Sequence, residues 1–253
     1  MDLLDIALYF AIAAIGGGLN SVAGGGTFLT FPVLILGGLS SIQANIVSTI
    51  ALWPGAVASA FAYRTERDVD SKTLTPFIII SILGASIGTA VLLLTPEQTF
   101  SALVPWLLLV AVLVFTFGGK GIAVLRAFSH ETTPTQKYAA WMFQFVIAIY
   151  GGYFGAGIGI LMLAMLQIMG LTHIHKMNAL KTILGSTINA VAVFIFLFSG
   201  RVVWDVAGVM IIGAIVGGYV GARMSLRVSA NKVRALVSVI GFAMSAYFFL
   251  YGV

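Results

Sequence analysis

The chain has 253 residues, of which 60% are hydrophobic and 8% are charged; its net charge is +5 and its mean hydropathy is +1.08. This composition excludes a soluble globular domain, in which about 25% of residues are charged, and the absence of cysteine excludes disulfides, thiolate metal sites and cysteine nucleophiles. We therefore expect an all-α polytopic membrane protein embedded in a lipid bilayer.

The first two apolar segments, 6–19 and 27–40, are short and are separated by a Gly-rich break. At about 1.5 Å per residue, each would span roughly 21 Å as a helix, less than the roughly 30 Å of a hydrocarbon core. We expect either a hairpin that enters the membrane and turns back or two short, steep crossings. Because unpaired peptide groups are costly in hydrocarbon, Gly24, Gly25 and Gly26 should line a cavity or lie buried in protein.

The helix that begins after this break is a candidate anion site. Free N–H groups at a helix N-terminus and the helix dipole favour a bound anion. Asn20, Ser21 and Thr27 flank the break and join its glycines as candidate substrate-binding residues. The alternative is that the glycines serve close helix packing, which is common in membranes.

The next segment, 42–63, carries Asn45, Ser48 and Thr49 at spacings of three and four residues. This spacing places the three side chains on one helical face, which we expect to line a cavity. Interhelical hydrogen bonds are the alternative role for such residues. Further apolar runs at 75–94, 100–117, 138–154 and 235–252 are near the length of a membrane crossing.

The second half of the chain repeats this plan about 133 residues later. Gly151–Gly159 takes the place of the first break, and Asn178, Lys181 and Thr182 take the places of the polar trio. The candidate glycines of this second break are Gly155, Gly157 and Gly159. The pairs Gly84/Gly88 and Gly217/Gly221 also correspond, and their small-xxx-small spacing predicts close helix packing.

Lys181 is the only charged residue well inside an apolar run. A cation within the membrane indicates a ligand or a pathway, although a lysine about 7 Å from the end of its helix can also snorkel to the interface. All eight carboxylates fall in loops or at their edges. The charges inside the membrane therefore favour an anionic substrate over a cation.

Lys and Arg residues gather in alternate loops, which predicts the orientation. Eleven of the thirteen lie in loops 64–72, 118–137 and 223–234 or at Lys176, and the positive-inside rule places these in the cytoplasm. Loop 95–99 and both termini then lie outside. We expect two inverted-topology repeats of about five hydrophobic segments each: residues 1–117, a cytoplasmic linker at 118–137, and residues 138–253.

The blocks Asn20–Gly26 and Gly151–Gly159, each followed by a Gly-Leu pair and an Asn-bearing helix, resemble the TauE/SafE sulfite exporter family. The resemblance covers essentially the whole chain. It implies a prokaryotic inner-membrane permease for small sulfur-containing anions such as sulfite or organosulfonates. The second block has no Asn or Ser before its glycines, so the site is expected to be asymmetric.

An internal repeat in a membrane protein is typical of transporters, whose sites lie where the halves meet. We therefore expect a secondary transporter that works by alternating access, with a passive anion channel as the alternative. An intramembrane enzyme is not expected, because the chain has no HExxH and no acid inside a span. We expect no cofactor, metal or nucleic-acid partner. The sequence leaves open whether the protein forms a homodimer.

Overall fold

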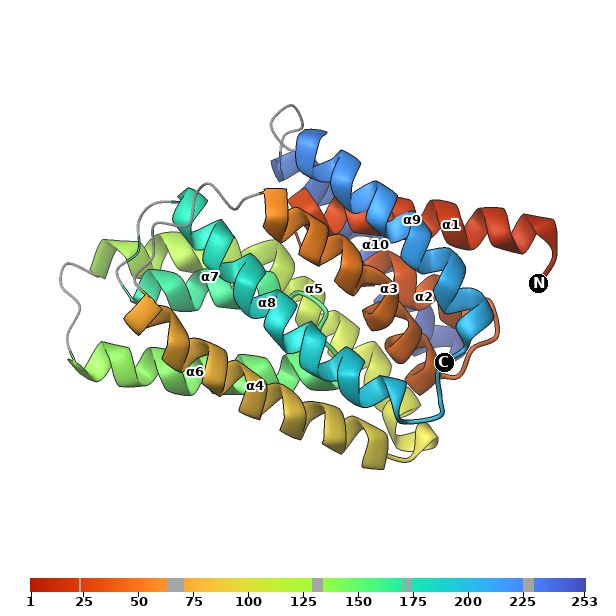
Figure 1. Ribbon diagram of the computed structural model, residues 1–253, viewed down its shortest axis with the longest axis horizontal. Coiled ribbons are helices and arrows are strands. Elements are labelled where there is room, and N and C mark those ends of the chain that lie inside the picture. The colour runs from red at the N-terminus through yellow and green to blue at the C-terminus, as the bar shows by residue number, and fades with distance from the viewer. Residues whose placement is uncertain (23, 63–70, 129–133, 170, 172–173, 225–229) are drawn as a thin grey trace.

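The computed structural model describes residues 1–22, 24–62, 71–128, 134–169, 171, 174–224 and 230–253. Over these residues the fold is all-helical, with ten helices and no strand (Figure 1). In chain order the helices are α1 (Leu3–Val22), α2 (Thr27–Leu36), α3 (Ser41–Ala62), α4 (Ser71–Leu94), α5 (Glu97–Phe128), α6 (Pro134–Tyr153), α7 (Ile158–Ile168), α8 (Ile174–Leu197), α9 (Trp204–Met224) and α10 (Ala230–Tyr251).

Six of the helices in the described part of the chain, namely α1, α4, α5, α8, α9 and α10, are long and apolar enough to cross a membrane. Helices α2 and α7 are apolar but only 10 and 11 residues long, which is about half the thickness of a hydrocarbon core. The prediction of an all-helical, multi-pass membrane protein with short helices after the two Gly-rich breaks is confirmed.

The first break is shorter than the sequence suggested. Gly16, Gly17 and Gly18 lie within α1, which has 20 residues rather than the expected fourteen. A Cβ on Gly17 would lie 2.5 Å from the carbonyl oxygen of Ala214. This glycine therefore serves close packing of α1 on α9, and the expectation of a short first segment was wrong.

Helices α3 and α6 cover most of the apolar runs 42–63 and 138–154, and neither is among the six candidate spans found in the described residues. Helices α5 and α6 extend into the predicted linker. Residues 129–133 between them, residues 64–70 of the predicted loop 64–72 and residues 225–229 of the predicted loop 223–234 lie outside the described residues.

Helices of the first half pair with helices of the second half. Helix α1 packs mainly against α9, and α4 packs mainly against α6 (Figure 1). Glycines allow these close approaches: Gly217 and Gly221 of α9 face Ala14 and Gly18 of α1, and Gly84 and Gly88 of α4 face Ala148 and Ile149 of α6. The packing role predicted for these glycine pairs is confirmed.

The packing pattern is nearly unchanged when α1–α5 are exchanged in order for α6–α10. Under this exchange the contact of α1 with α9 corresponds to the contact of α6 with α4. In the same way, the contact of α3 with α9 corresponds to that of α8 with α4, and the contact of α5 with α7 corresponds to that of α10 with α2. All six of these helix pairs are in contact. Two pairs map onto themselves, α3 with α8 and α5 with α10, and both are also in contact. The two halves thus occupy matching environments.

Aromatic contacts hold the short helix α2 in the core. Phe28 and Phe31 are fully buried. The ring of Phe28 lies edge-on to Phe115 of α5 at 5.4 Å, and the ring of Phe31 lies edge-on to Phe154 at 5.3 Å. Such pairs are worth about 0.5–1.5 kcal/mol each beyond their burial. Because Phe154 belongs to the second break, this contact ties α2 to the second break.

Candidate functional site

The two Gly-rich breaks lie against each other at the centre of the site. A Cβ on Gly24 would lie 4.0 Å from the Cα of Gly159, so the two backbones are nearly in contact. Gly24 has φ +80°, and Gly157, which precedes α7, has φ +76°. Side chains rarely tolerate these angles, so the sharp turns into α2 and α7 depend on glycine.

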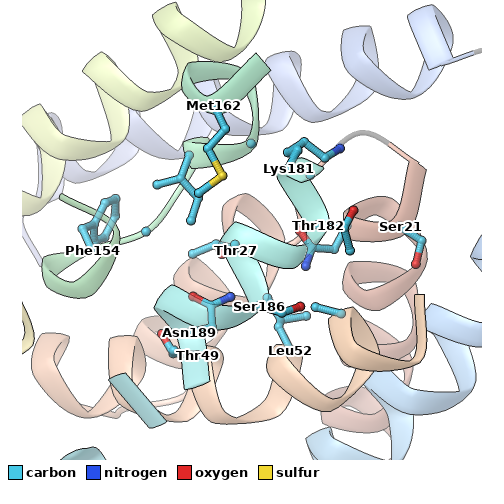
Figure 2. A pocket seen from close by; sticks show the side chains of 17 residues that line it. Ser21, Thr27, Thr49, Leu52, Phe154, Met162, Lys181, Thr182, Ser186 and Asn189 are labelled. Atoms are coloured by element: carbon cyan, nitrogen blue, oxygen red, sulfur yellow. The ribbon is translucent and has the colours of Figure 1, made fainter. Parts of the chain in front are cut away.

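A cavity of about 80 Å³ opens beside this contact (Figure 2). At about 10–15 Å³ per water by this measure, it has room for a small organic or inorganic anion. It lies between α1, α2, α3, α7 and α8. Its lining residues are Asn20, Ser21, Gly24, Thr27, Thr49, Leu52, Ala56, Phe154, Gly155, Ile158, Gly159, Met162, Lys181, Thr182, Gly185, Ser186 and Asn189.

Nine of the fifteen residues predicted from the sequence line this cavity. They come from both halves of the chain, as expected for a site between the repeats. They are Asn20, Ser21, Gly24, Thr27, Thr49, Gly155, Gly159, Lys181 and Thr182.

The predicted residues Asn45, Ser48 and Asn178 do not line the cavity. Asn45 is buried and donates its Nδ2 hydrogen to the Tyr153 carbonyl oxygen at 3.0 Å. The hydroxyl of Ser48 is hydrogen-bonded to that of Thr30 at 2.7 Å. Only the last residue of the first polar trio, Thr49, reaches the cavity, so for the other two the alternative role in interhelical hydrogen bonding applies.

The predicted glycines Gly25, Gly26 and Gly157 also lie outside the cavity lining. A Cβ on Gly25 would lie 2.6 Å from Cγ1 of Val237 and 3.1 Å from the ring of Phe115. Gly26 approaches the carbonyl of Gly16 in the same way. These glycines allow the chain to pack closely behind the cavity rather than within it.

Sequence reasoning missed Ser186 and Asn189, which line the cavity on α8. The signal was present, because Thr182, Ser186 and Asn189 follow each other at spacings of four and three residues and therefore share a helical face. The apolar side of the lining, which includes Leu52, Ile158 and Met162, was not predicted.

The cavity carries a positive charge. Of the described residues that line it, Lys181 is the only charged one, and none is acidic. The charge of Arg234, on α10, also acts on Lys181 and is likewise positive. No group of three His, Asp or Glu side chains that could hold a metal ion lies within the described residues.

The stem of Lys181 runs along the bare backbone at the start of α7. A Cβ on Gly159 would lie 3.3 Å from Cδ of Lys181 and 3.9 Å from its Cε. The ammonium group thus stands close to the first turn of α7. In Figure 2, Lys181 and Met162 lie toward one end of the cavity, and Asn189 and Thr49 lie toward the other.

Hydrogen bonds fix several of the lining groups. Ser21 donates its hydroxyl to the carbonyl oxygens of Gly17 and Gly218, at 3.1 and 3.0 Å, and so links α1 to α9. Thr182 donates its hydroxyl to the Asn178 carbonyl at 2.8 Å. The amide groups of Asn20 and Asn189 and the ammonium of Lys181 can act as the cavity's side-chain donors.

Comparison with known proteins places the chain in a family. Residues 9–248 match the sequence profile of the family described as Sulfite exporter TauE/SafE. The chain belongs to this family. The resemblance inferred from the two Gly-rich blocks is therefore confirmed, and both breaks and every residue of the cavity lie within the part of the chain that matches the TauE/SafE profile.

Three curated relatives illustrate the breadth of the TauE/SafE match. A "probable membrane transporter protein" of Haemophilus influenzae is 26% identical over 251 residues, which cover 97% of this chain and 94% of the relative. A "probable membrane transporter protein ORF9" of Sinorhizobium is also 26% identical, with coverage of 95% and 90%. The "probable membrane transporter protein YfcA" of Escherichia coli K12 is 23% identical, with coverage of 96% and 89%. No solved structure matches the chain.

Proposed function

We propose that this protein is a secondary transporter that moves a small sulfur-containing anion across a prokaryotic inner membrane. The observation that carries the proposal is the cavity where the two Gly-rich breaks meet, with Lys181 as the one charged group among its described lining residues. Membership of the TauE/SafE family and the transporter names of the relatives support the same class of function.

The start of α7 completes the anion site in this proposal. The N–H of Ile160 is bonded to the Gly157 carbonyl at 3.2 Å, and the N–H groups of Ile158 and Gly159 precede this first helical bond. Both residues line the cavity. Together with the dipole of α7 and the ammonium of Lys181, they would hold an anion with one full counter-charge. The nine predicted residues that line the cavity are the proposed binding residues.

Alternating access is proposed from the relation between the halves. The exchange of α1–α5 for α6–α10 preserves most of the packed pairs, and the charge pattern of the loops supports opposite orientations of the two halves. We therefore propose residues 1–117 and 138–253 as inverted repeats, with both termini outside. In this arrangement one part of the protein would move against the other around the fixed site between the breaks.

A passive anion channel is the second candidate function, because no residue is assigned to the binding of a coupling ion. The two are separated by transport in proteoliposomes that contain the purified protein. A carrier gives saturable uptake of labelled sulfite that is accelerated by unlabelled sulfite or an organosulfonate inside. A channel gives single-channel currents in a planar bilayer and no such acceleration. Uptake that no sulfur-containing anion accelerates or inhibits would overturn the proposed substrate class.

A further inference from the structure

The cavity has a second polar end, away from the proposed anion site. Thr49 of α3 and Ser186 and Asn189 of α8 line this end. Along α8, at about 1.5 Å per residue, Ser186 lies roughly 7.5 Å beyond Lys181 and Asn189 lies roughly 12 Å beyond it. An anionic group held at Lys181 and α7 would leave these side chains facing the remainder of a bound molecule.

The hydroxyl of Ser186 is buried and has no hydrogen-bond partner among the described residues. Its neighbours on α8 behave differently: Thr182 and Thr187 both donate to the carbonyl four residues earlier, at 2.8 and 2.9 Å. Buried polar groups in folded proteins are nearly always satisfied, and an exception in a binding cavity suggests an absent partner. A ligand group in the cavity would supply that partner.

The backbone at Ser186 is held in place by the opposite half of the chain. The indole N–H of Trp53 on α3 is hydrogen-bonded to the Ser186 carbonyl oxygen at 3.2 Å. This bond fixes α8 against α3 at the level of the second polar end. The hydroxyl is therefore presented from a rigid position, as recognition of a specific ligand group requires.

Among the described residues that line it, the cavity offers no counter-charge for a second full charge on the ligand. Its described lining contains no Asp or Glu to balance an ammonium group, and no cation besides Lys181 to balance a second anionic group. Hydroxyl and amide side chains, as in Thr49, Ser186 and Asn189, both donate and accept hydrogen bonds. They match a neutral hydroxyl group.

The space between the two polar ends has an apolar side. Leu52, Ala56, Ile158 and Met162 line it, and such side chains favour contact with methylene groups over water. With a volume of about 80 Å³, the cavity has room for a two-carbon anion. The lining thus combines one anionic position, a short apolar middle and a neutral polar end.

We propose that this cavity binds a hydroxyalkanesulfonate, and that Ser186 and Asn189 determine specificity by hydrogen-bonding its hydroxyl group. The proposal rests on the proposed function, because it takes the sulfonate to lie at Lys181 and the start of α7. It goes beyond that function by naming the neutral group of the substrate and the side chains that read it.

The test compares two ligands that differ in one hydroxyl. Purified protein is titrated calorimetrically with 2-hydroxyethanesulfonate and with ethanesulfonate, and then with 2-aminoethanesulfonate and sulfoacetate. The wild type should bind the hydroxyl compound about three- to tenfold more tightly than ethanesulfonate, the range expected for one neutral hydrogen bond. The ammonium and carboxylate compounds should bind more weakly than the hydroxyl compound.

Two substitutions assign the preference to α8. Ser186→Ala and Asn189→Leu should each reduce the ratio of the affinity for 2-hydroxyethanesulfonate to the affinity for ethanesulfonate. Thr187→Val is the matched control, because its hydroxyl is bonded to the Ile183 carbonyl and it does not line the cavity. This variant should keep the wild-type ratio.

The outcomes separate the two proposals. Equal binding of 2-hydroxyethanesulfonate and ethanesulfonate by the wild type, or an unchanged ratio in both α8 variants, would overturn the role of Ser186 and Asn189 and leave the anion transporter intact. Failure of every sulfonate and of sulfite to bind would overturn the proposed function as well.

Discussion

Trp53 of α3 and Ser186 of α8 are joined by a hydrogen bond of 3.2 Å, from the indole N–H to the carbonyl oxygen. The two residues are 133 positions apart, the same offset at which Asn45 and Asn178 repeat. Helices α3 and α8 therefore touch at equivalent positions, which is the contact expected next to a twofold axis between the halves. The bond also lies at the wall of the cavity, because Ser186 is one of its lining residues.

We expect Trp53→Phe to loosen this contact without abolishing folding. The substitution removes one hydrogen bond, worth about 0.5–1.5 kcal/mol, and keeps an aromatic ring in place. Thermal unfolding of the purified protein should shift downward by the corresponding few degrees, and sulfite affinity should fall modestly. Unchanged unfolding would show that the bond does not contribute to holding α3 on α8.

Lys181 should be essential for transport but not for folding. Lys181→Met keeps the length and apolar character of the stem and removes the charge, so sulfite uptake into proteoliposomes should be lost while the unfolding temperature changes little. Lys181→Arg should retain part of the activity, because a guanidinium keeps the charge but has a different shape. Wild-type uptake by the methionine variant would instead assign Lys181 to snorkelling toward the interface.

Gly159 is expected to position Lys181 through its lack of a side chain. In Gly159→Ala the new Cβ would lie 3.3 Å from Cδ of Lys181, so the stem must shift away from the cavity. Sulfite affinity should fall severalfold, whereas stability should hold, because alanine is favoured over glycine in a helix by about 1 kcal/mol. Binding and thermal unfolding, measured together, check both effects.

Gly208→Ala on α9 is the matched control for this substitution, because a Cβ there meets nothing within 4 Å. It should raise or preserve stability and leave sulfite binding unchanged. If the Gly159→Ala and Gly208→Ala variants bind sulfite with equal affinity, Gly159 does not contribute to sulfite binding.

The orientation of the halves can be checked with single cysteines, since the chain has none of its own. One cysteine replaces Gln98, in the loop that is predicted to lie outside the cell membrane, and the other replaces Lys232, in the loop that is predicted to lie in the cytoplasm. Both of these side chains are exposed. An impermeant thiol reagent added to intact cells should label the first and not the second. Labelling of both from the same side would contradict the inverted repeats.

The parts of the site that the sequence predicted are those with local causes. Gly24 adopts a positive φ and Gly159 leaves room for a neighbouring side chain, so both needed glycine, and their spacing from the apolar segments was visible. Lys181 stood out because a charge inside an apolar run is rare. In each case the residue type itself carried the signal.

The parts that the sequence missed depend on which neighbours a helix meets. Asn45 is turned toward the Tyr153 carbonyl by the packing of α3, and its spacing to Thr49 could not show this. Ser186 and Asn189 were overlooked because their counterparts in the first half are the apolar residues Trp53 and Ala56. A repeat emphasises shared residues and conceals those that make the two halves differ.

The most direct test of the central claim is a structure determined with sulfite or an organosulfonate bound. We predict that the anion lies between the two Gly-rich breaks, within hydrogen-bonding distance of the Lys181 ammonium group and of the N–H groups of Ile158 and Gly159. An anion bound well away from Gly24 and Gly159, with the cavity beside them occupied by water alone, would contradict the proposed site.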